Sequence, residues 1–211
     1  MNALTTGLAR YLDETRLQRI RQTKVGIAGA GGLGSNCAQL LARSGFMDFV
    51  LVDFDVVECS NLNRQFFFQD QIGQPKVQGL ADNLRQINPD VSVRMVQARI
   101  TPESVDTIFA DCGVVIEAMD TPECKQMLAA AYSRSGKLLV AASGLAGWGD
   151  SDRIAVHRIH DSFYMVGDLS SGVESGLPPM APCVTIAAAK QADIILSWAL
   201  GDLPVGKQGG L

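Results

Sequence analysis

Apolar runs and segments of helical periodicity alternate along most of the chain. Several of the runs are apolar without alternation, which is typical of strands buried on both faces of a parallel sheet. Between them, apolar residues recur every three or four positions, as on the buried side of an amphipathic helix. This pattern predicts strands at 24–30, 49–54, 91–96, 113–119 and 137–143, and helices at 33–44, 75–87, 102–110 and 121–134.

Strand and helix in turn predict an α/β fold, a doubly wound, Rossmann-like, mainly parallel sheet with helices on both faces. Pro75, Pro102 and Pro122 each fall where the first turn of a predicted helix can hold a proline. Ligands of such a sheet bind outside the carboxyl ends of its strands. Residues that follow the predicted strands are therefore the first candidates for function.

The pattern changes after Gly144. Two short strands at 152–159 and 162–168 predict an antiparallel hairpin, and a Gly/Pro/Ser-rich crossing at 167–182 leads to a last helix. Since no linker is long enough to divide the chain, we predict one domain over residues 1–211. Its expected parts are a helical N-terminal arm (1–23), a Rossmann-like core (24–143), the hairpin and crossing (144–182) and a final helix (183–200).

Composition narrows the expected partners. With 211 residues, 47% apolar and 19% charged, the chain is long enough for a sizeable core and has no bias toward disorder. A net charge of -4 argues against a nucleic-acid surface, although five cations face two acids in residues 1–24. No apolar run approaches the ~20 residues of a membrane span, and the N-terminus lacks the apolar core of a signal peptide. We expect a cytoplasmic protein with neither nucleic acid nor membrane as partner.

A glycine-rich turn joins the first predicted strand to the first predicted helix of the core. Gly29, Gly31 and Gly34 match G-x-G-x-x-G in that context, and Gly32 lies within the same turn. Glycine lets the backbone turn sharply, so that its N–H groups meet phosphate oxygens at the positive end of a helix. The alternative is a tight turn without a ligand.

An acidic residue follows the second predicted strand. Asp53 can accept hydrogen bonds from ribose hydroxyls, which suits a dehydrogenase and an ATP-dependent enzyme equally. Asp55 points to the same side if the strand continues, or caps a loop. These residues therefore indicate a nucleoside but not the reaction.

The next segment favours a triphosphate. Asn61, Arg64, Gln65 and Lys76 gather beyond the carboxyl end of the second strand, and an arginine with a lysine suits three phosphates better than two. Asp120 follows the fourth strand, where a carboxylate beside phosphates suits Mg²⁺. Its alternative role is the N-cap of the next helix.

These motifs together resemble the ThiF/MoeB/HesA family, relatives of the ubiquitin-activating enzymes, and are most similar to its short ThiF type. The resemblance implies an ATP- and Mg²⁺-dependent homodimer that adenylates the C-terminal Gly-Gly of a small ubiquitin-like sulfur carrier such as ThiS. Thiamine (thiazole) biosynthesis is the implied context, with a MoaD-type carrier as an alternative. The segments that carry it are GAGGLGS (29–35), LVDFD (51–55), SNLNRQ (60–65), GQPK (73–76), INPD (87–90), Asp120 and MAPCVTIAAAKQA (180–192).

The resemblance also implies roles for individual residues. Asp53 would hold the ribose, Asp120 would hold Mg²⁺, and Arg10 of one subunit would reach the ATP of the other. The expected catalytic residues are Arg64, Lys76 and Asp120, and the expected nucleotide-binding residues are Gly29, Gly31, Gly32, Gly34, Asp53, Asp55, Asn61, Arg64, Gln65, Lys76 and Arg10. Two alternatives from other classes remain, a nicotinamide oxidoreductase and a non-catalytic scaffold half.

Other expectations concern stability, metals and assembly. Lys76 is expected to be exposed and to contribute little to folding, and the apolar residues of 183–200 suggest a symmetric dimer. No C-x-x-C pair occurs among the five cysteines, so no zinc is expected. Cys183 is a candidate carrier-linking thiol or, more simply, a small buried residue. His157 and His160, three apart on one strand, should face opposite sides and bind no shared metal.

Overall fold

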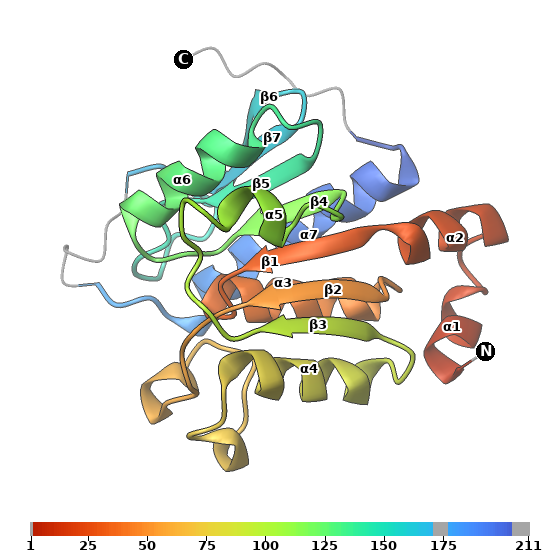
Figure 1. Ribbon diagram of the computed structural model, residues 1–211, viewed down its shortest axis with the longest axis horizontal. Helices are drawn as coiled ribbons and strands as arrows, with labels where there is room; N and C mark the ends of the chain where they lie inside the picture. Colours follow the sequence, from red (N-terminus) through yellow and green to blue (C-terminus); the bar gives the residue numbers. More distant parts are fainter. Residues whose placement is uncertain (1, 171–176, 204–211) are drawn as a thin grey trace.

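A seven-stranded sheet with helices on both faces forms the molecule (Figure 1). The computed structural model describes residues 2–170 and 177–203. The strands are β1 Lys24–Ala28, β2 Asp48–Val52, β3 Ser92–Val96, β4 Val114–Glu117, β5 Leu138–Ala142, β6 Ala155–His160 and β7 Phe163–Gly167. The helices are α1 Ala3–Leu8, α2 Glu14–Gln22, α3 Gly32–Arg43, α4 Lys76–Ile87, α5 Val105–Ile108, α6 Pro122–Tyr132 and α7 Ala181–Leu200, with 3₁₀ turns η1 Cys59–Asn61 and η2 Gln69–Gln71.

The strand order is β3-β2-β1-β4-β5-β7-β6, and every neighbouring pair is parallel except β6 and β7. This confirms the predicted doubly wound sheet with an antiparallel C-terminal extension. The order reverses between β1 and β4, whose carboxyl ends point to the left in Figure 1. Such a reversal leaves a crevice for ligands outside the carboxyl ends of the strands.

Two apolar cores explain why the central strands are apolar without alternation. In β2, Phe49 and Leu51 pack in the core beneath α3, α4 and α7, whereas Val50 and Val52 pack in the core beneath α5 and α6. Adjacent side chains of a strand point to opposite faces, so a sheet covered on both faces needs apolar residues at every position. Fully burying each such side chain contributes roughly 1.5–3 kcal/mol.

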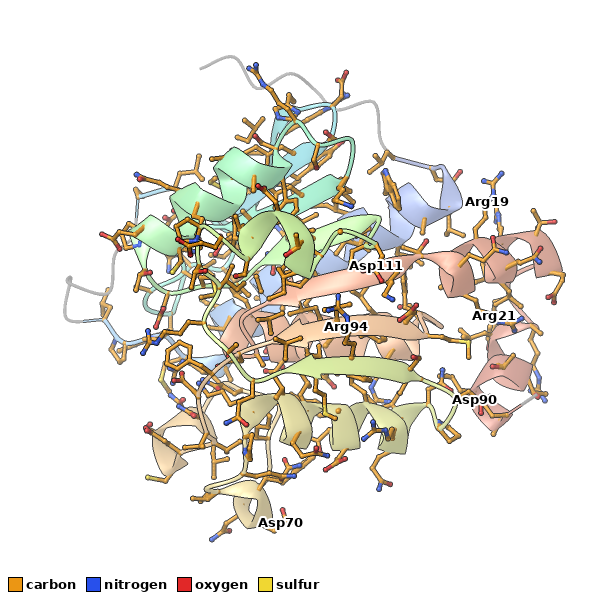
Figure 2. All side chains as sticks on the ribbon, in the orientation of Figure 1. Arg19, Arg21, Asp70, Asp90, Arg94 and Asp111 are labelled. Atoms are coloured by element: carbon orange, nitrogen blue, oxygen red, sulfur yellow. The ribbon has the colours of Figure 1, made fainter. Side chains whose placement is uncertain are left out.

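The N-terminal arm consists of two short helices at the amino-terminal edge of the sheet (Figure 1). Asn2 caps α1 by accepting from the N–H of Thr5, and its Nδ2 donates to Oδ1 of Asn88 at 2.6 Å. Arg19 and Arg21 project from α2 at that same edge (Figure 2). The basic residues of the arm therefore lie away from the carboxyl ends of the strands.

Three sequence predictions were wrong in detail. The helix predicted at 102–110 shortens to α5, which begins at Val105, so Pro102 precedes it; Pro75 is the N-cap of α4, and only Pro122 lies in a first turn. A bulge in β6 places His157 opposite Met165 and His160 opposite Phe163. The extra residue shifts the alternation, so the two histidines share one face.

The final helix, α7, confirms the helix predicted at 183–200 and begins two residues earlier. Its 20 residues have a mean hydropathy of 1.3 in the most apolar window, enough by length and composition to cross a membrane, and half of that window is buried in the domain. Ile194 and Ile195 are buried in the chain's own core, and Trp198 packs against it. The apolar content of this helix therefore requires neither a membrane nor a second subunit. Residues 171–176 of the predicted crossing lie outside the described residues.

Candidate functional site

A cavity of about 590 Å³ opens at the carboxyl ends of β1, β2 and β4. The glycine turn, the loop after β2, the first residue of α4 and the loop after β4 enclose it. Of the residues predicted from the sequence, Gly29, Gly31, Gly32, Asp53, Asp55, Asn61, Arg64, Gln65, Lys76 and Asp120 line this cavity. Ten residues scattered over the sequence therefore meet in one place.

Two predicted glycines have distinct structural reasons. Gly29 has a φ of +98°, and a Cβ there would lie 2.6 Å from the carbonyl oxygen of Ala118. A Cβ at Gly34 would collide with the carbonyl oxygen of Gly29, so this glycine lets α3 pack closely against β1. Gly34 is buried and does not line the cavity. It shapes the turn and leaves ligand contacts to the other glycines.

The carboxylate of Asp53 is bound to the backbone of the glycine turn and of the loop after β2. Its Oδ2 accepts from the N–H of Ala30 at 2.7 Å, and its Oδ1 accepts from the N–H of Asp55 at 2.9 Å. Burial raises the pKa of this carboxyl above its ordinary value, against the lowering effect of these two hydrogen bonds. Each oxygen retains a lone pair, so the carboxylate that fixes the glycine turn can still accept a hydroxyl.

Lys76 begins α4 and is held by Asp55. Its Nζ lies 2.9 Å from Oδ2 of Asp55, and its N–H donates to the carbonyl of Asp55 at 2.9 Å. The lysine is only 7% exposed, so the prediction of an exposed lysine was wrong: the loop after β2 folds back on α4 and covers its stem. The structure gives Asp55 the role of a counter-ion that holds a cation at the cavity wall.

The loop between β2 and α4 is ordered by its own polar side chains. Asn61 accepts from the N–H of Glu58 at 3.0 Å and closes the η1 turn. Arg64 donates from Nη1 to the carbonyl of Ser60 at 3.0 Å and to Oδ1 of Asn63 at 2.8 Å. Gln65 is 9% exposed, and its Oε1 is buried without a hydrogen-bond partner in the part of the chain that the structure describes.

Asp120 follows β4 and is exposed, and its carboxylate makes no hydrogen bond to the described residues. The N-cap of α6 is Thr121, so the alternative of Asp120 as N-cap is not supported. No cluster of three or more histidine, cysteine, aspartate or glutamate side chains suitable for a metal occurs among the described residues. One exposed carboxylate at the wall of a cavity of about 590 Å³ fits Mg²⁺, which takes one or two carboxylates with substrate oxygens and water.

Sequence reasoning missed the groups that support these residues. Glu117, the last residue of β4, is buried; Nζ of Lys125 bonds both its oxygens at 3.0 Å, and it accepts from the N–H of Met119 at 2.7 Å. Burial raises the pKa of the Glu117 carboxyl, and Lys125 opposes that rise. Ser35 and Asn36 of α3 bond the loop that carries Arg64. In the sequence, an acid three residues before Asp120 and two polar residues after the glycine turn are weak evidence of a buried supporting role. Solvent-exposed residues of helices and loops give the same pattern.

Two further predicted residues lie away from the cavity. Arg10 falls between α1 and α2, at the amino ends of the strands and thus at the opposite end of the sheet from the cavity (Figure 1). It therefore cannot reach the cavity of its own chain. Cys183 lies in the first turn of α7 and is buried. The burial of this thiol favours the simpler interpretation of Cys183 as a packed residue.

The arrangement suits binding and charge neutralisation. Two cations, a glycine turn at the start of α3 and a free carboxylate face one cavity, whereas its described lining contains no histidine, cysteine or serine. Such a site suits the binding of a polyphosphate and the neutralisation of its charge.

The chain resembles known proteins in both sequence and structure. The sequence profile of the ThiF family matches residues 5–205. The crystal structure of the E. coli tRNA N6-threonylcarbamoyladenosine dehydratase in complex with ATP superposes with a TM-score of 0.79 and 28% identity, over 94% of this chain and 92% of that one.

The curated relatives are longer proteins than this chain. The adenylyltransferase and sulfurtransferase UBA4 of Candida glabrata is 31% identical over 191 residues, 87% of this chain and 44% of that protein. The SAMP-activating enzyme E1 of Haloferax volcanii is 41% identical over 111 residues, covering 52% of this chain and 41% of the relative. The chain thus spans less than half the length of these two curated relatives. On the match over nearly its whole length, the chain belongs to the ThiF family.

Proposed function

We propose that the protein adenylates the C-terminal Gly-Gly carboxylate of a small ubiquitin-like sulfur carrier at the expense of ATP. The observation that carries this proposal is the convergence of Arg64, Lys76 and Asp120 on one cavity with the glycine turn. Binding of a dinucleotide would use the glycine turn and Asp53 but would give these three side chains no role. Relatives named as adenylyltransferases and as a SAMP-activating enzyme support the same reaction.

The reaction needs little from the protein beyond position and charge. The carrier carboxylate is ionised at neutral pH, so it attacks the α-phosphorus without a general base. A bond forms between the carboxylate oxygen and the α-phosphorus, the bond from that phosphorus to the bridging oxygen breaks, and pyrophosphate leaves with the electron pair. Lys76 and Arg64 stabilise the charge that develops on pyrophosphate.

Asp120 is the residue that would hold Mg²⁺, which neutralises phosphate charge when bound. Asp53 would orient the ribose, and the N–H groups of the glycine turn would hold the α-phosphate. Gln65 would bind the phosphates with Arg64 and Lys76, and Asn61 would order the loop between β2 and α4. The position of each residue in the cavity and the family resemblance support these roles.

The finer identity of the partner follows the resemblance to the short ThiF type. We propose a ThiS-like carrier, and with it a role in forming the thiazole of thiamine, in the cytoplasm. Arg10 cannot reach the cavity of its own chain. We therefore propose that it reaches the cavity of the other subunit in a symmetric homodimer.

A thermal-shift experiment tests the nucleotide. ATP with Mg²⁺ should raise the melting temperature of the purified chain, and NAD should not. A shift with NAD alone would favour the oxidoreductase. A shift with ATP but no pyrophosphate exchange with any Gly-Gly carrier would favour a scaffold half.

A second candidate is ATP-dependent dehydration of threonylcarbamoyladenosine in tRNA, the substrate named for the E. coli enzyme. The superposition over nearly both whole chains favours it. The net charge of -4 and the position of the arm's arginines away from the cavity argue against it (Figure 2). Pyrophosphate release measured with a Gly-Gly carrier and, separately, with tRNA distinguishes the two candidate functions. Release that depends on the carrier supports adenylation, and release that depends on tRNA supports dehydration.

A further inference from the structure

Two consecutive side chains of α3 connect the glycine turn to the loop that carries Arg64. Oγ of Ser35 donates to the carbonyl of Gly31 at 2.6 Å and accepts from the N–H of Phe66 at 2.9 Å. Nδ2 of Asn36 donates to the carbonyl of Gly32 at 2.6 Å and to the carbonyl of Arg64 at 2.8 Å. We call Ser35 and Asn36 the polar brace.

Two of these four hydrogen bonds lie within the helix and are common there, and the other two leave the helix. Serine in a helix often bonds the carbonyl four residues earlier, as Ser35 does with Gly31 and Asn36 with Gly32. The second bond of each residue leaves the helix and fixes the backbone at residues 64 and 66. Both side chains are buried, with 0% and 7% of their surface exposed. Buried hydrogen bonds of this kind hold their partners at a fixed separation.

The brace fixes the residue on either side of Gln65. The stem of Arg64 lies over Gly32, with its Cγ 3.6 Å from where a Cβ of Gly32 would be. The Nε2 of Gln65 lies 3.9 Å from the corresponding point at Gly31. The two side chains therefore follow the glycine turn at a spacing that the brace sets, on the cavity wall that we assign to the triphosphate.

We propose that Ser35 and Asn36 are positioning residues that align the Arg64–Gln65 loop with the glycine turn for recognition of the β- and γ-phosphates. The inference rests on the proposed function only in taking ATP as the ligand. The brace bonds the glycine turn only at the carbonyls of Gly31 and Gly32, not at the N–H groups that would hold the α-phosphate, and its other two bonds reach the loop that carries Arg64. Its loss should therefore weaken the binding of a triphosphate and spare a monophosphate.

The test compares MgATP and AMP binding to the full chain by isothermal titration calorimetry. Asn36→Leu keeps the approximate size of the side chain and removes its donor; it should weaken MgATP about tenfold and change AMP less than about twofold, since one misplaced charge-assisted contact contributes about that factor. Ser44→Ala is the matched control, because Ser44 bonds the carbonyl of Leu40 near the other end of the same helix. Its binding of both nucleotides should equal wild type.

An equal loss for both nucleotides would show that Asn36 only supports the fold, and an unchanged MgATP affinity would show that it does nothing for the loop. Either result overturns the proposal. If Asn36→Leu does not fold, Ser35→Ala carries the same prediction with the same two contrary results. A wild-type chain that binds no MgATP would instead contradict the proposed function itself.

Discussion

The Nζ of Lys76 and the Oδ2 of Asp55 lie 2.9 Å apart at the wall of the cavity. The carboxylate is half-exposed and the lysine is buried, so the pair presents a fixed cation at the first residue of α4. Because the ammonium is aligned before any nucleotide arrives, a triphosphate would meet a charge already in place. Such preorganisation makes an electrostatic contact effective in catalysis.

Lys76→Ala should reduce carrier adenylation by about 10²–10³, the usual cost of removing one preorganised charge contact. It should also lower the free energy of unfolding by about 1–3 kcal/mol, since the charged hydrogen bond to Asp55 is lost in a buried setting. Initial rates of carrier-dependent pyrophosphate exchange and urea denaturation measure the two effects.

Lys24→Ala is the control for Lys76. Lys24 also pairs with carboxylates, Asp111 at 2.7 Å and Asp48 at 3.4 Å, but at the amino-terminal edge of the sheet. This variant should lose some stability and keep full activity. If Lys76→Ala loses no more activity than Lys24→Ala, the assignment of Lys76 to the triphosphate is wrong.

Asp120→Ala should abolish pyrophosphate exchange and leave thermal stability within about 0.5 kcal/mol, because the exposed carboxylate makes no hydrogen bond to the described residues. Titrating Mg²⁺ should not restore the variant. Asp161→Ala, which removes an exposed carboxylate from the β6–β7 turn, should behave as wild type. Near-normal exchange by Asp120→Ala would remove this residue from the magnesium site.

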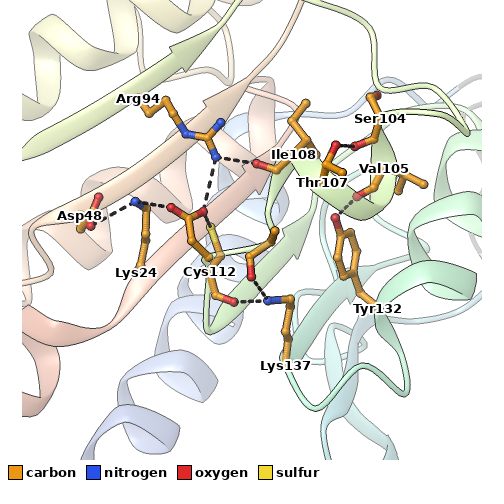
Figure 3. A network of polar contacts seen from close by, with 12 residues as sticks. Lys24, Asp48, Arg94, Ser104, Val105, Thr107, Ile108, Cys112, Tyr132 and Lys137 are labelled. Atoms are coloured by element: carbon orange, nitrogen blue, oxygen red, sulfur yellow. Dashed lines mark hydrogen bonds and ion pairs between the residues drawn. The ribbon is translucent and has the colours of Figure 1, made fainter.

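The ion pairs at the other edge of the sheet predict a pH dependence of stability. Figure 3 shows Lys24, Asp48 and Arg94 in this network. The hydrogen bond from Lys24 lowers the pKa of Asp111, and the same bond raises the pKa of Lys24. The Asp111 contribution is therefore present above its ordinary pKa of about 3.9 and lost as pH falls through the lowered value.

The Lys24 contribution is complete below its ordinary pKa of about 10.4 and lost as pH rises through the raised value. Asp111→Asn should therefore destabilise the chain by about 0.2–1 kcal/mol between these limits, since the pair is partly exposed. The difference from wild type should shrink in both acid and alkali, measured by urea denaturation at low salt. A difference that stays constant at both extremes would contradict the assignment.

A homodimer with shared sites predicts complementation. Arg10→Ala and Lys76→Ala should each be inactive alone, yet a re-equilibrated equal mixture should recover about a quarter of wild-type activity, because random pairing of a two-fold dimer leaves one intact site in half of the dimers. Sedimentation should show dimers at micromolar concentration. A monomer, or a mixture without recovery, would contradict the role of Arg10 in the partner's cavity.

The strands and the cavity were predictable from the sequence because both follow local rules. An unbroken apolar run such as 49–52 means a strand buried on two faces, and polar residues after strand ends gather at one edge of a parallel sheet. The glycine turn was predictable since only glycine tolerates the φ of +98° at Gly29 and the close packing at Gly34.

What the sequence did not predict depends on contacts between distant segments. The burial of Lys76 arises from the loop after β2 folding over α4, and no periodicity records such a contact. The bulge in β6 puts His160 on the same face as His157, where alternation predicted opposite faces, because one extra residue shifts a period of two. The second bonds of Ser35 and Asn36 join residues about 30 positions apart, a separation that helical spacing does not encode.

Carrier-dependent exchange of labelled pyrophosphate into ATP tests the central claim most directly. The purified chain with Mg²⁺, ATP and a ThiS-like carrier ending in Gly-Gly should exchange label, and the same carrier without its last glycine should not. Lys76→Ala should lower the rate by about 10²–10³. Exchange that is equal with the intact and the shortened carrier, or absent with every Gly-Gly carrier while ATP still binds, would contradict the account.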